Sequence, residues 1–306
     1  MAKTDLTKTI MARFDRLKTG RQNWETHWQE VADYMQPRKA DVTRTRSKGD
    51  KRTELVFDSS PIQAVELLAA SLHGMLTNPS TPWFSLRYKD QGLDMDDEAK
   101  LWLEGVTETM YTAFNRSNFQ QEIFELYHDL ITFGTAAMFI EEDQGDLLKF
   151  STRHINEIYI TENDKGRIDT VYRKFKITLR AAAQQFGTFL SEEAKTKVEK
   201  DPFDEIDILH AVYPRQDFNP TKKDKENMEF ESVYVEYKNG NELSVGGFVE
   251  FPFVVPRYLK ASHEIYGRSP AMTALPDVKM LNEMSKTTIK AAQKQVDPPL
   301  LVPDDG

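Results

Sequence analysis

Lysine side chains recur at helical spacing towards the end of the chain. Lys279, Lys286, Lys290 and Lys294 are separated by seven, four and four residues, and this spacing places them on one stripe of a helix. Glu283 falls on the same stripe and can pair with Lys279 or Lys286. The stripe is either the solvated side of a surface helix or a row of cations that faces a DNA channel in a ring.

A second basic segment covers residues 38–54. It has no apolar periodicity and holds seven basic residues against three acids, a local charge of +4. Such a run predicts a mobile, solvated loop, and it is also a candidate for contact with phosphates or with a partner. The basic residues are Arg38, Lys39, Arg44, Arg46, Lys48, Lys51 and Arg52.

Four carboxylates gather around a predicted turn. Glu141, Glu142, Asp143 and Asp146 could hold a divalent cation, because carboxylate oxygens suit hard ions. A cation there would support a metal-dependent nuclease. Their spacing does not match a calcium loop, so the simpler interpretation is a solvated turn at the end of a strand, with no metal.

An aromatic pair, Trp83-Phe84, has two interpretations as well. Exposed aromatic rings form platforms on which the bases of single-stranded nucleic acid stack. Aromatic side chains are more often part of a hydrophobic core, and we expect that placement here.

Sequence patterns of catalysis are missing from the chain. It has no G-x-x-x-x-G-K-[ST] loop, no G-x-G-x-x-G, no H-E-x-x-H and no G-x-S-x-G. The six histidines, at positions 27, 73, 128, 154, 210 and 263, share no metal-ligand spacing. We therefore expect a protein that is not an enzyme and that needs no cofactor.

The amino-acid composition excludes further classes of protein. The 306 residues are 39% hydrophobic and 29% charged, with a net charge of −9 and no cysteine. An acidic chain does not grip nucleic acid over most of its surface. Without cysteine it can form neither disulfides nor thiolate zinc sites. The sequence shows neither a signal peptide nor a run of about 18 apolar residues, so we expect a soluble protein made in the cytoplasm, with no membrane partner.

Helical periodicity predicts the elements that position these residues. Two short helices are expected over residues 6–17 and 24–35, and others over 59–75, 96–116, 119–133, 179–186, 191–200 and 269–296. Ser59 and Ser269 are candidate caps because a proline follows each at or near the first helical position.

Alternating patterns predict short strands in the middle of the chain. They cover residues 83–88, 136–141, 147–151, 157–160, 169–175, 206–213, 230–237, 242–245 and 251–258. Lys238-Asn-Gly-Asn241 is a hairpin signal. Helices, then a small and mostly antiparallel β unit, then a long helix define an α+β fold.

The chain resembles the head-to-tail connecting, or portal, proteins of short-tailed bacteriophages. The first stretch that carries the resemblance is WETHWQEVADYMQP, and the second is FDSSPIQAVELLAASLHGMLTNPSTPWFSL. A third is EIFELYHDLITFGTAAMFIEED, and the most specific is YGRSPAMTALPDVKMLNEMSKTTIKAAQKQVDPPLLVPDDG. They span nearly the whole chain in the order that the family shows.

The resemblance implies a fold and a location. It divides the chain into a helical wing region (1–135), a β-rich wing subdomain with a helical insert (136–262), and a stem helix with the start of a clip (263–306). It implies a dodecameric ring at one vertex of the capsid, through which double-stranded DNA is packaged and ejected. The family places a second stem helix and a crown after the clip, so we expect a longer protein to continue beyond Gly306.

The same resemblance implies partners: the terminase large subunit, the major capsid and scaffolding proteins, and the tail adaptor and internal core proteins. Rival hypotheses are the nuclease above, or another virion adaptor or core protein, which would lack the long helix that ends in Asp-Pro-Pro. The portal hypothesis requires residues 269–296 to stand away from their own β unit as a strut shared between copies.

Overall fold

The computed structural model describes residues 3–47, 49–89, 92, 96–143, 145, 147–219, 221–222 and 224–298, with side chains from residue 6 onward. Seven α-helices lie within these residues. They are α1 (Lys3–Met35), α2 (Ser60–Leu76), α3 (Asp97–Arg116), α4 (Phe119–Phe133), α5 (Leu179–Phe186), α6 (Glu192–Lys200) and α7 (Pro270–Val296).

Eight strands form two antiparallel sheets, so the predicted α+β class is confirmed. The larger sheet has the order β3-β4-β5-β6-β7, and the smaller has the order β2-β1-β8. The strands are β1 (Ala137–Asp143), β2 (Leu147–Arg153), β3 (Ile158–Glu162), β4 (Ile168–Thr178), β5 (Glu205–Pro214), β6 (Phe230–Glu236), β7 (Asn241–Phe248) and β8 (Phe253–Val254).

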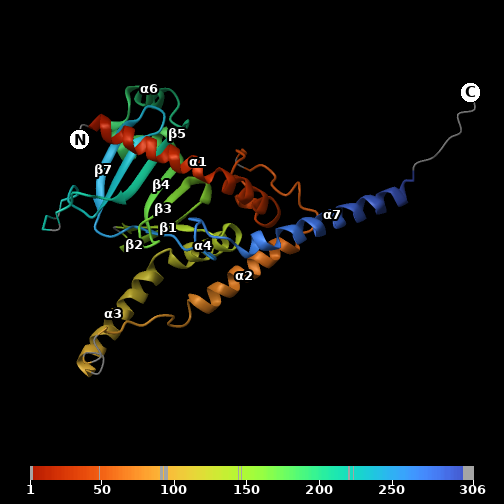
Figure 1. Ribbon diagram of the computed structural model, residues 1–306, viewed down its shortest axis with the longest axis horizontal. Coiled ribbons are helices and arrows are strands. Elements are labelled where there is room, and N and C mark those ends of the chain that lie inside the picture. The colour runs from red at the N-terminus through yellow and green to blue at the C-terminus, as the bar shows by residue number, and fades with distance from the viewer. Residues whose placement is uncertain are drawn as a thin grey trace, which may run out of the picture.

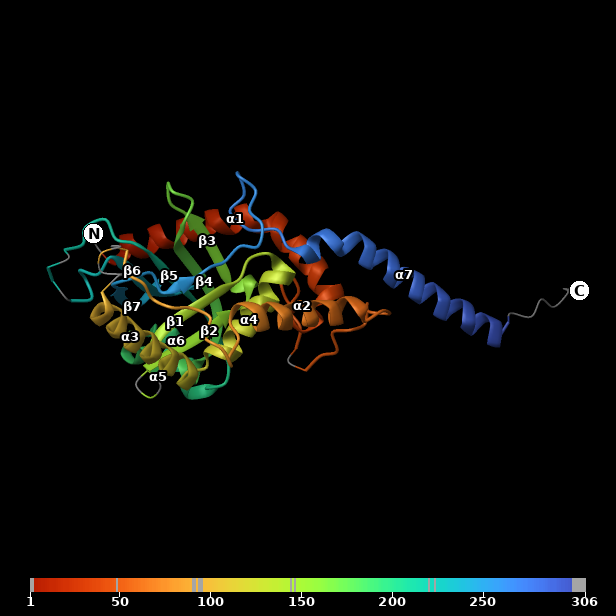
Figure 2. The ribbon, with the colours of Figure 1, turned by 90° about the horizontal axis from the view of Figure 1, so that it is seen from below.

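The body of the molecule carries two projecting helices. Figure 1 shows the sheets gathered at the N-terminal end, with α1 running across them, while α7 extends away on the other side and α3 projects at an angle. The second view also shows α7 leaving the body beside α1 and α2 (Figure 2). In the described part of the chain, no helix is long and apolar enough to cross a membrane.

The large sheet is covered on both faces because side chains along its strands alternate. On β5, Leu209 belongs to the cluster that packs against Phe14 of α1, and its neighbour Ile208 belongs to the cluster around Leu179 and Phe186 of α5. A third and largest cluster joins α1, α2, α4, the small sheet and the start of α7. Within it the Trp28 indole N–H donates to the carbonyl of Phe133 at 3.0 Å.

Helix α1 corrects one prediction. Two short helices with a break between residues 17 and 24 were expected, but a single helix of 33 residues runs through Gly20. The buried Arg21 explains the continuity: its guanidinium donates to the carbonyls of Ile155 and Asn156 at 2.8 Å each, and to Glu25 one turn along at 2.7 Å. These bonds outweigh the cost of about 1 kcal/mol for a glycine within a helix.

The strand predicted at Trp83–Tyr88 is also wrong. The segment is irregular, because its amides bond to a side chain rather than to a neighbouring strand. The hydroxyl of Tyr111 accepts from the amides of Trp83 (2.7 Å) and Phe84 (2.6 Å) and donates to the carbonyl of Phe84 (2.8 Å).

The strand predicted over residues 251–258 shrinks to the two residues of β8. Proline has no amide to donate to a ladder, and Pro252 and Pro256 flank β8. Their carbonyls still accept hydrogen bonds from the amides of Ile140 (2.9 Å) and Ala136 (3.2 Å). The segment therefore follows β1 without forming a full strand.

The other predicted elements are confirmed to within a few residues at their ends. The hairpin at Lys238–Asn241 joins β6 to β7, with Gly240 at a φ of 64°. Helix α4 ends at Gly134, whose φ is 75°. A Cβ on Gly134 would lie 2.3 Å from the carbonyl oxygen of Gly267, so the close approach of these two segments also requires glycine.

Candidate functional site

The start of α7 is fixed to the body by its cap. Ser269 is a buried residue whose hydroxyl accepts from the amide of Met272 at 2.9 Å and donates to the carbonyl of Thr132, in α4, at 2.8 Å. Pro270 follows at the first helical position, as predicted. The cap thus sets the direction in which α7 leaves the body.

The middle of α7 is held by a side chain that the sequence analysis did not single out. Asn282 is buried, and its amide oxygen accepts from the backbone amides of Phe57 (2.7 Å) and Asp58 (3.2 Å). Its amide nitrogen donates to the carbonyl of Leu55 at 2.9 Å. One side chain therefore clamps the segment before α2 onto α7.

The lysines of the stripe have different surroundings along α7, and the change occurs near Asn282. Lys279 forms an ion pair with Glu30 of α1. Lys286 pairs with Glu283 at 2.9 Å and stands 5.7 Å from the centre of the Phe57 ring. Lys290 and Lys294 lie further out on α7 and are exposed; in the described residues neither belongs to an ion pair.

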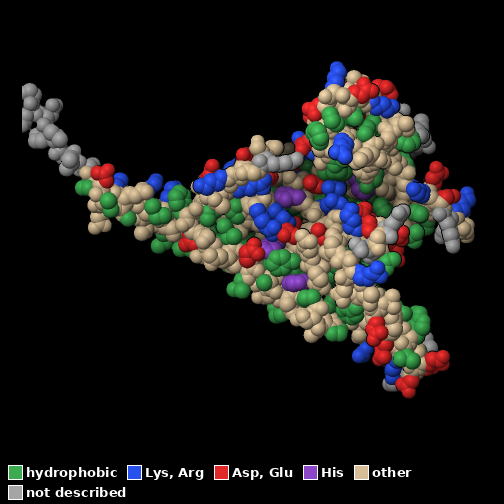
Figure 3. All heavy atoms as spheres, turned by 180° about the vertical axis from the view of Figure 1, so that it is seen from behind, with side chains coloured by type: hydrophobic (Ala, Val, Ile, Leu, Met, Phe, Trp, Pro, Cys, Tyr) green, Lys and Arg blue, Asp and Glu red, His purple; other side chains and the backbone are tan. Residues whose placement is uncertain are grey.

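Apolar side chains of α7 are exposed both beside the body and beyond it. Met280 and Met284, at 61% and 59% exposed, lie on the side of the helix away from buried Leu275. Ile289 and Val296, at 46% and 86% exposed, continue the stripe that is buried further back. Figure 3 shows hydrophobic and basic side chains next to one another along this projecting helix.

The basic loop is largely paired with acids of its own chain. Ion pairs join Arg38 to Glu125 (2.8 Å), Lys39 to Asp129 (2.5 Å) and to Glu125 (3.1 Å), Arg44 to Asp33 (3.3 Å), Arg46 to Asp33 (4.0 Å) and Arg52 to Asp41 (2.5 Å). Lys51 is exposed, and Lys48 lies outside the described residues. This pairing reduces the positive charge that the loop offers to an outside phosphate.

The pKa values of the two acids that pair with Lys39 shift in opposite directions. Burial raises the pKa of Asp129, which is 1% exposed, and the ammonium of Lys39 offsets only part of that rise. Burial also acts to raise the pKa of Glu125, but hydrogen bonds from Arg38 and Lys39 outweigh it and leave that pKa lowered.

The other candidate sites gain no support from the geometry. Glu141 pairs with Lys149 at 3.0 Å, and Asp146 lies outside the described residues. Among the residues that the structure describes, no three His, Asp or Glu side chains gather to hold a metal. Trp83 packs on the core and stacks on Phe119 with ring centres 5.9 Å apart, as the core interpretation predicted.

Sequence reasoning found the cap Ser269, but it missed Asn282 and could not assign Lys279 its partner, because the partners of these two residues are remote in the chain. Asn282 and Leu55 are 227 residues apart, and Lys279 and Glu30 are 249 apart. The only signal in the sequence was a polar residue on the packed side of a helix.

These features define a class of protein: a compact α+β body with a long projecting helix whose apolar side chains are left exposed by the part of the chain that the structure describes. Subunits of assemblies have this character, because a neighbour covers such surfaces.

Comparison with known proteins identifies the family. Residues 7–305 match the model of the bacteriophage head to tail connecting protein family, and the chain belongs to that family. It is 32% identical over 312 residues to a probable portal protein of Bordetella phage BPP-1, and 30% identical over 309 residues to the portal protein of Salmonella phage epsilon15. These alignments cover 99% of the chain but 56% and 55% of those proteins, so the chain spans about half the length of the relatives it matches.

Proposed function

We propose that this chain is a subunit of a closed ring at a capsid vertex, and that α7 forms part of the wall of the channel through which phage double-stranded DNA is packaged and ejected. The observation that carries the proposal is the outer half of α7. It projects from the body, exposes apolar side chains on two sides and ends in two cations without an ion-pair partner in the described residues.

The two apolar sides suit a ring. In a cyclic assembly each copy contacts its neighbours through two different surfaces. Met280 and Met284 lie on one side of α7, while Ile289 and Val296 lie on another. A helix between two neighbouring copies would have both sides covered.

The charge of the subunit suits DNA that must slide. Each phosphate that a lysine neutralises adds affinity for DNA. Each such contact also makes the logarithm of the binding constant fall by about 0.9 for every unit increase in the logarithm of the salt concentration. Many strong contacts in every copy would hold the duplex in place. A subunit of net charge −9 gives weak attraction instead, because on the described part of α7 Lys290 and Lys294 alone among the stripe lysines have no ion-pair partner and Lys286 is offset by Glu283.

The family supports further proposals about partners. A portal ring at the vertex would dock the terminase motor during packaging, contact the capsid and scaffolding proteins, and later receive the tail adaptor and core proteins. Hydrolysis of ATP would belong to the motor, since this chain has no phosphate-binding loop.

DNA packaging with substituted subunits tests the channel role. In K290A/K294A we expect the subunit to stay folded and the packaging rate at low salt to fall severalfold, because cations that attract the duplex are lost. The difference from the unchanged protein should shrink as salt rises, since salt screens the remaining charges.

A matched double variant, K200A/K222A, removes two exposed lysines elsewhere and should package DNA normally. If K290A/K294A packaged DNA at the normal rate at every salt concentration, Lys290 and Lys294 would not face the duplex. Loss of solubility would show instead that they pack against protein.

A further inference from the structure

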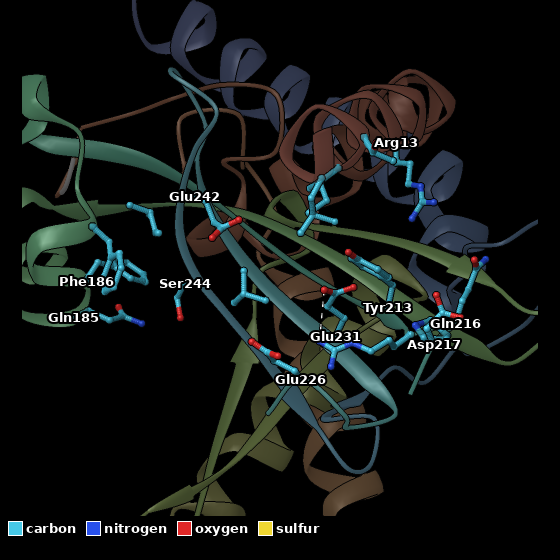
Figure 4. A pocket seen from close by; sticks show the side chains of 18 residues that line it. Arg13, Gln185, Phe186, Tyr213, Gln216, Asp217, Glu226, Glu231, Glu242 and Ser244 are labelled. Carbon is cyan, nitrogen blue, oxygen red and sulfur yellow. Dashed lines mark ion pairs between the residues drawn. The ribbon is translucent and has the colours of Figure 1, made fainter. Parts of the chain in front are cut away.

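A cleft of about 870 Å³ lies at the end of the molecule opposite α7. Figure 4 shows it between the first turns of α1, the end of α5 and strand β7. Its apolar lining includes Leu6 and Ile10 of α1, Phe186 at the end of α5, and Phe189 just beyond that helix. The cleft therefore wraps around one edge of the large sheet.

Strand β7 forms that edge, and no strand of the described chain pairs with its outer side. Its two ends are covered. Asn241 donates to the carbonyl of Phe189 at 2.7 Å, and a Cβ on Gly247 would lie 2.7 Å from the carbonyl of Lys225. Between them, Ser244 and Val245 are exposed beside the Phe189 ring, which is 63% exposed.

Negative charge prevails around this open edge. Four carboxylates and two guanidinium groups line the cleft, and Arg215 already contacts Glu231 at 3.5 Å and the carbonyl of Gly246 at 3.3 Å. Such a lining repels phosphates and attracts lysine and arginine. The six charged residues are Arg13, Arg215, Asp217, Glu226, Glu231 and Glu242.

We propose that this cleft binds an extended basic segment of a partner protein, which adds to β7 as a sixth strand along Glu242–Val245. An exposed sheet edge offers main-chain hydrogen bonds to such a segment. Apolar side chains at alternate positions of the segment would contact Phe189 and Val245, and its lysines or arginines would meet Glu226 and Glu231. The cleft is remote from α7, so this proposal stands apart from the channel.

A synthetic peptide tests the proposal on the purified protein. The probe is an octapeptide, acetylated and amidated at its ends, that alternates valine with lysine. We expect saturable binding by fluorescence anisotropy, with affinity at least tenfold above that of the same peptide carrying glutamate for lysine. Hydrogen exchange at the amides of residues 242–245 should slow severalfold when the lysine peptide is bound.

Two exposed glutamates give matched variants. E226K reverses a charge at the cleft and should weaken binding of the lysine peptide severalfold, whereas E104K makes the same change on α3 and should leave binding unaltered. Circular dichroism would verify that both variants stay folded. Equal binding of the two peptides, or binding without protection of residues 242–245, would overturn the proposal.

Discussion

At the scale of single residues, the chain relies on a few buried polar side chains. Arg21, His210 and Asn282 are each less than a tenth exposed. Arg21 and Asn282 bond to backbone groups 134 and 227 residues away, and His210 bonds to Ser232 on the neighbouring strand β6. Nothing in the sequence distinguishes these three residues from exposed residues of the same types. Sequence reasoning could therefore place them on a helix or a strand but could not find their partners.

His210 should make stability depend on pH. It is buried, donates to or accepts from the hydroxyl of Ser232 at 2.9 Å and stacks on Tyr234. Burial, with smaller contributions from Arg173 and Arg153, lowers its pKa from 6.5 to about 3. The unfolded chain therefore takes up a proton that the folded chain refuses, and stability is lost as pH falls from about 6.5 towards 3.

The slope due to His210 should approach about 1.4 kcal/mol per pH unit. We expect H210Q to remove that part of the dependence when unfolding by urea is measured at pH 7, 6 and 5. An unchanged slope in H210Q would show that other groups cause it.

Arg21 should be worth several kcal/mol to the fold. In R21M three backbone carbonyls and Glu25 lose their buried partner, and breaking a buried charged network costs about 3–5 kcal/mol. Thermal unfolding should show a large drop in Tm, whereas R16M, at an exposed position on the same helix, should change Tm little. Equal Tm values for the two variants would contradict this role.

At the scale of elements, periodicity found nearly every helix and strand, and it failed where side chains satisfy the backbone. Residues 83–88 have the pattern of a strand, but the hydroxyl of Tyr111 accepts from the amides of Trp83 and Phe84. Periodicity indicated two short helices over residues 6–17 and 24–35, but α1 runs unbroken through Gly20, next to which Arg21 bonds to the carbonyl of Ile155. The lysine stripe was correctly placed on one helix, yet the sequence could not show that Lys279 serves an internal contact with Glu30.

Gly20 should therefore be replaceable. A Cβ at this position would meet nothing within 4 Å, and alanine favours a helix interior over glycine by about 0.5–1 kcal/mol. We expect G20A to raise the free energy of unfolding by that amount, measured by urea denaturation. G134A, at a positive φ and against Gly267, should instead unfold the protein or prevent its soluble expression.

At the scale of the whole molecule, the two ends offer different surfaces. The end with α7 exposes apolar side chains beside two lysines that form no ion pair with any described residue, and the opposite end carries an acidic cleft around a sheet edge. A ring with α7 at its centre would place the cleft towards the rim, away from the DNA.

Charged substitutions on α7 should separate assembly from folding. M280E/M284E alters two exposed side chains, so the subunit should fold normally by circular dichroism but elute as a monomer in size-exclusion chromatography with light scattering. T196E/K200Q, which makes the same change of charge on α6, should assemble like the unchanged protein. Normal assembly of M280E/M284E would show that this side of α7 is not an interface.

Electron cryomicroscopy of the purified protein at high concentration tests the central claim most directly. The account predicts closed rings with a central opening, in which α7 lies along the opening, neighbouring copies cover Met284 and Val296, and Lys290 and Lys294 point inward. A uniform population of single subunits, or rings in which α7 lies on the outer rim, would contradict it.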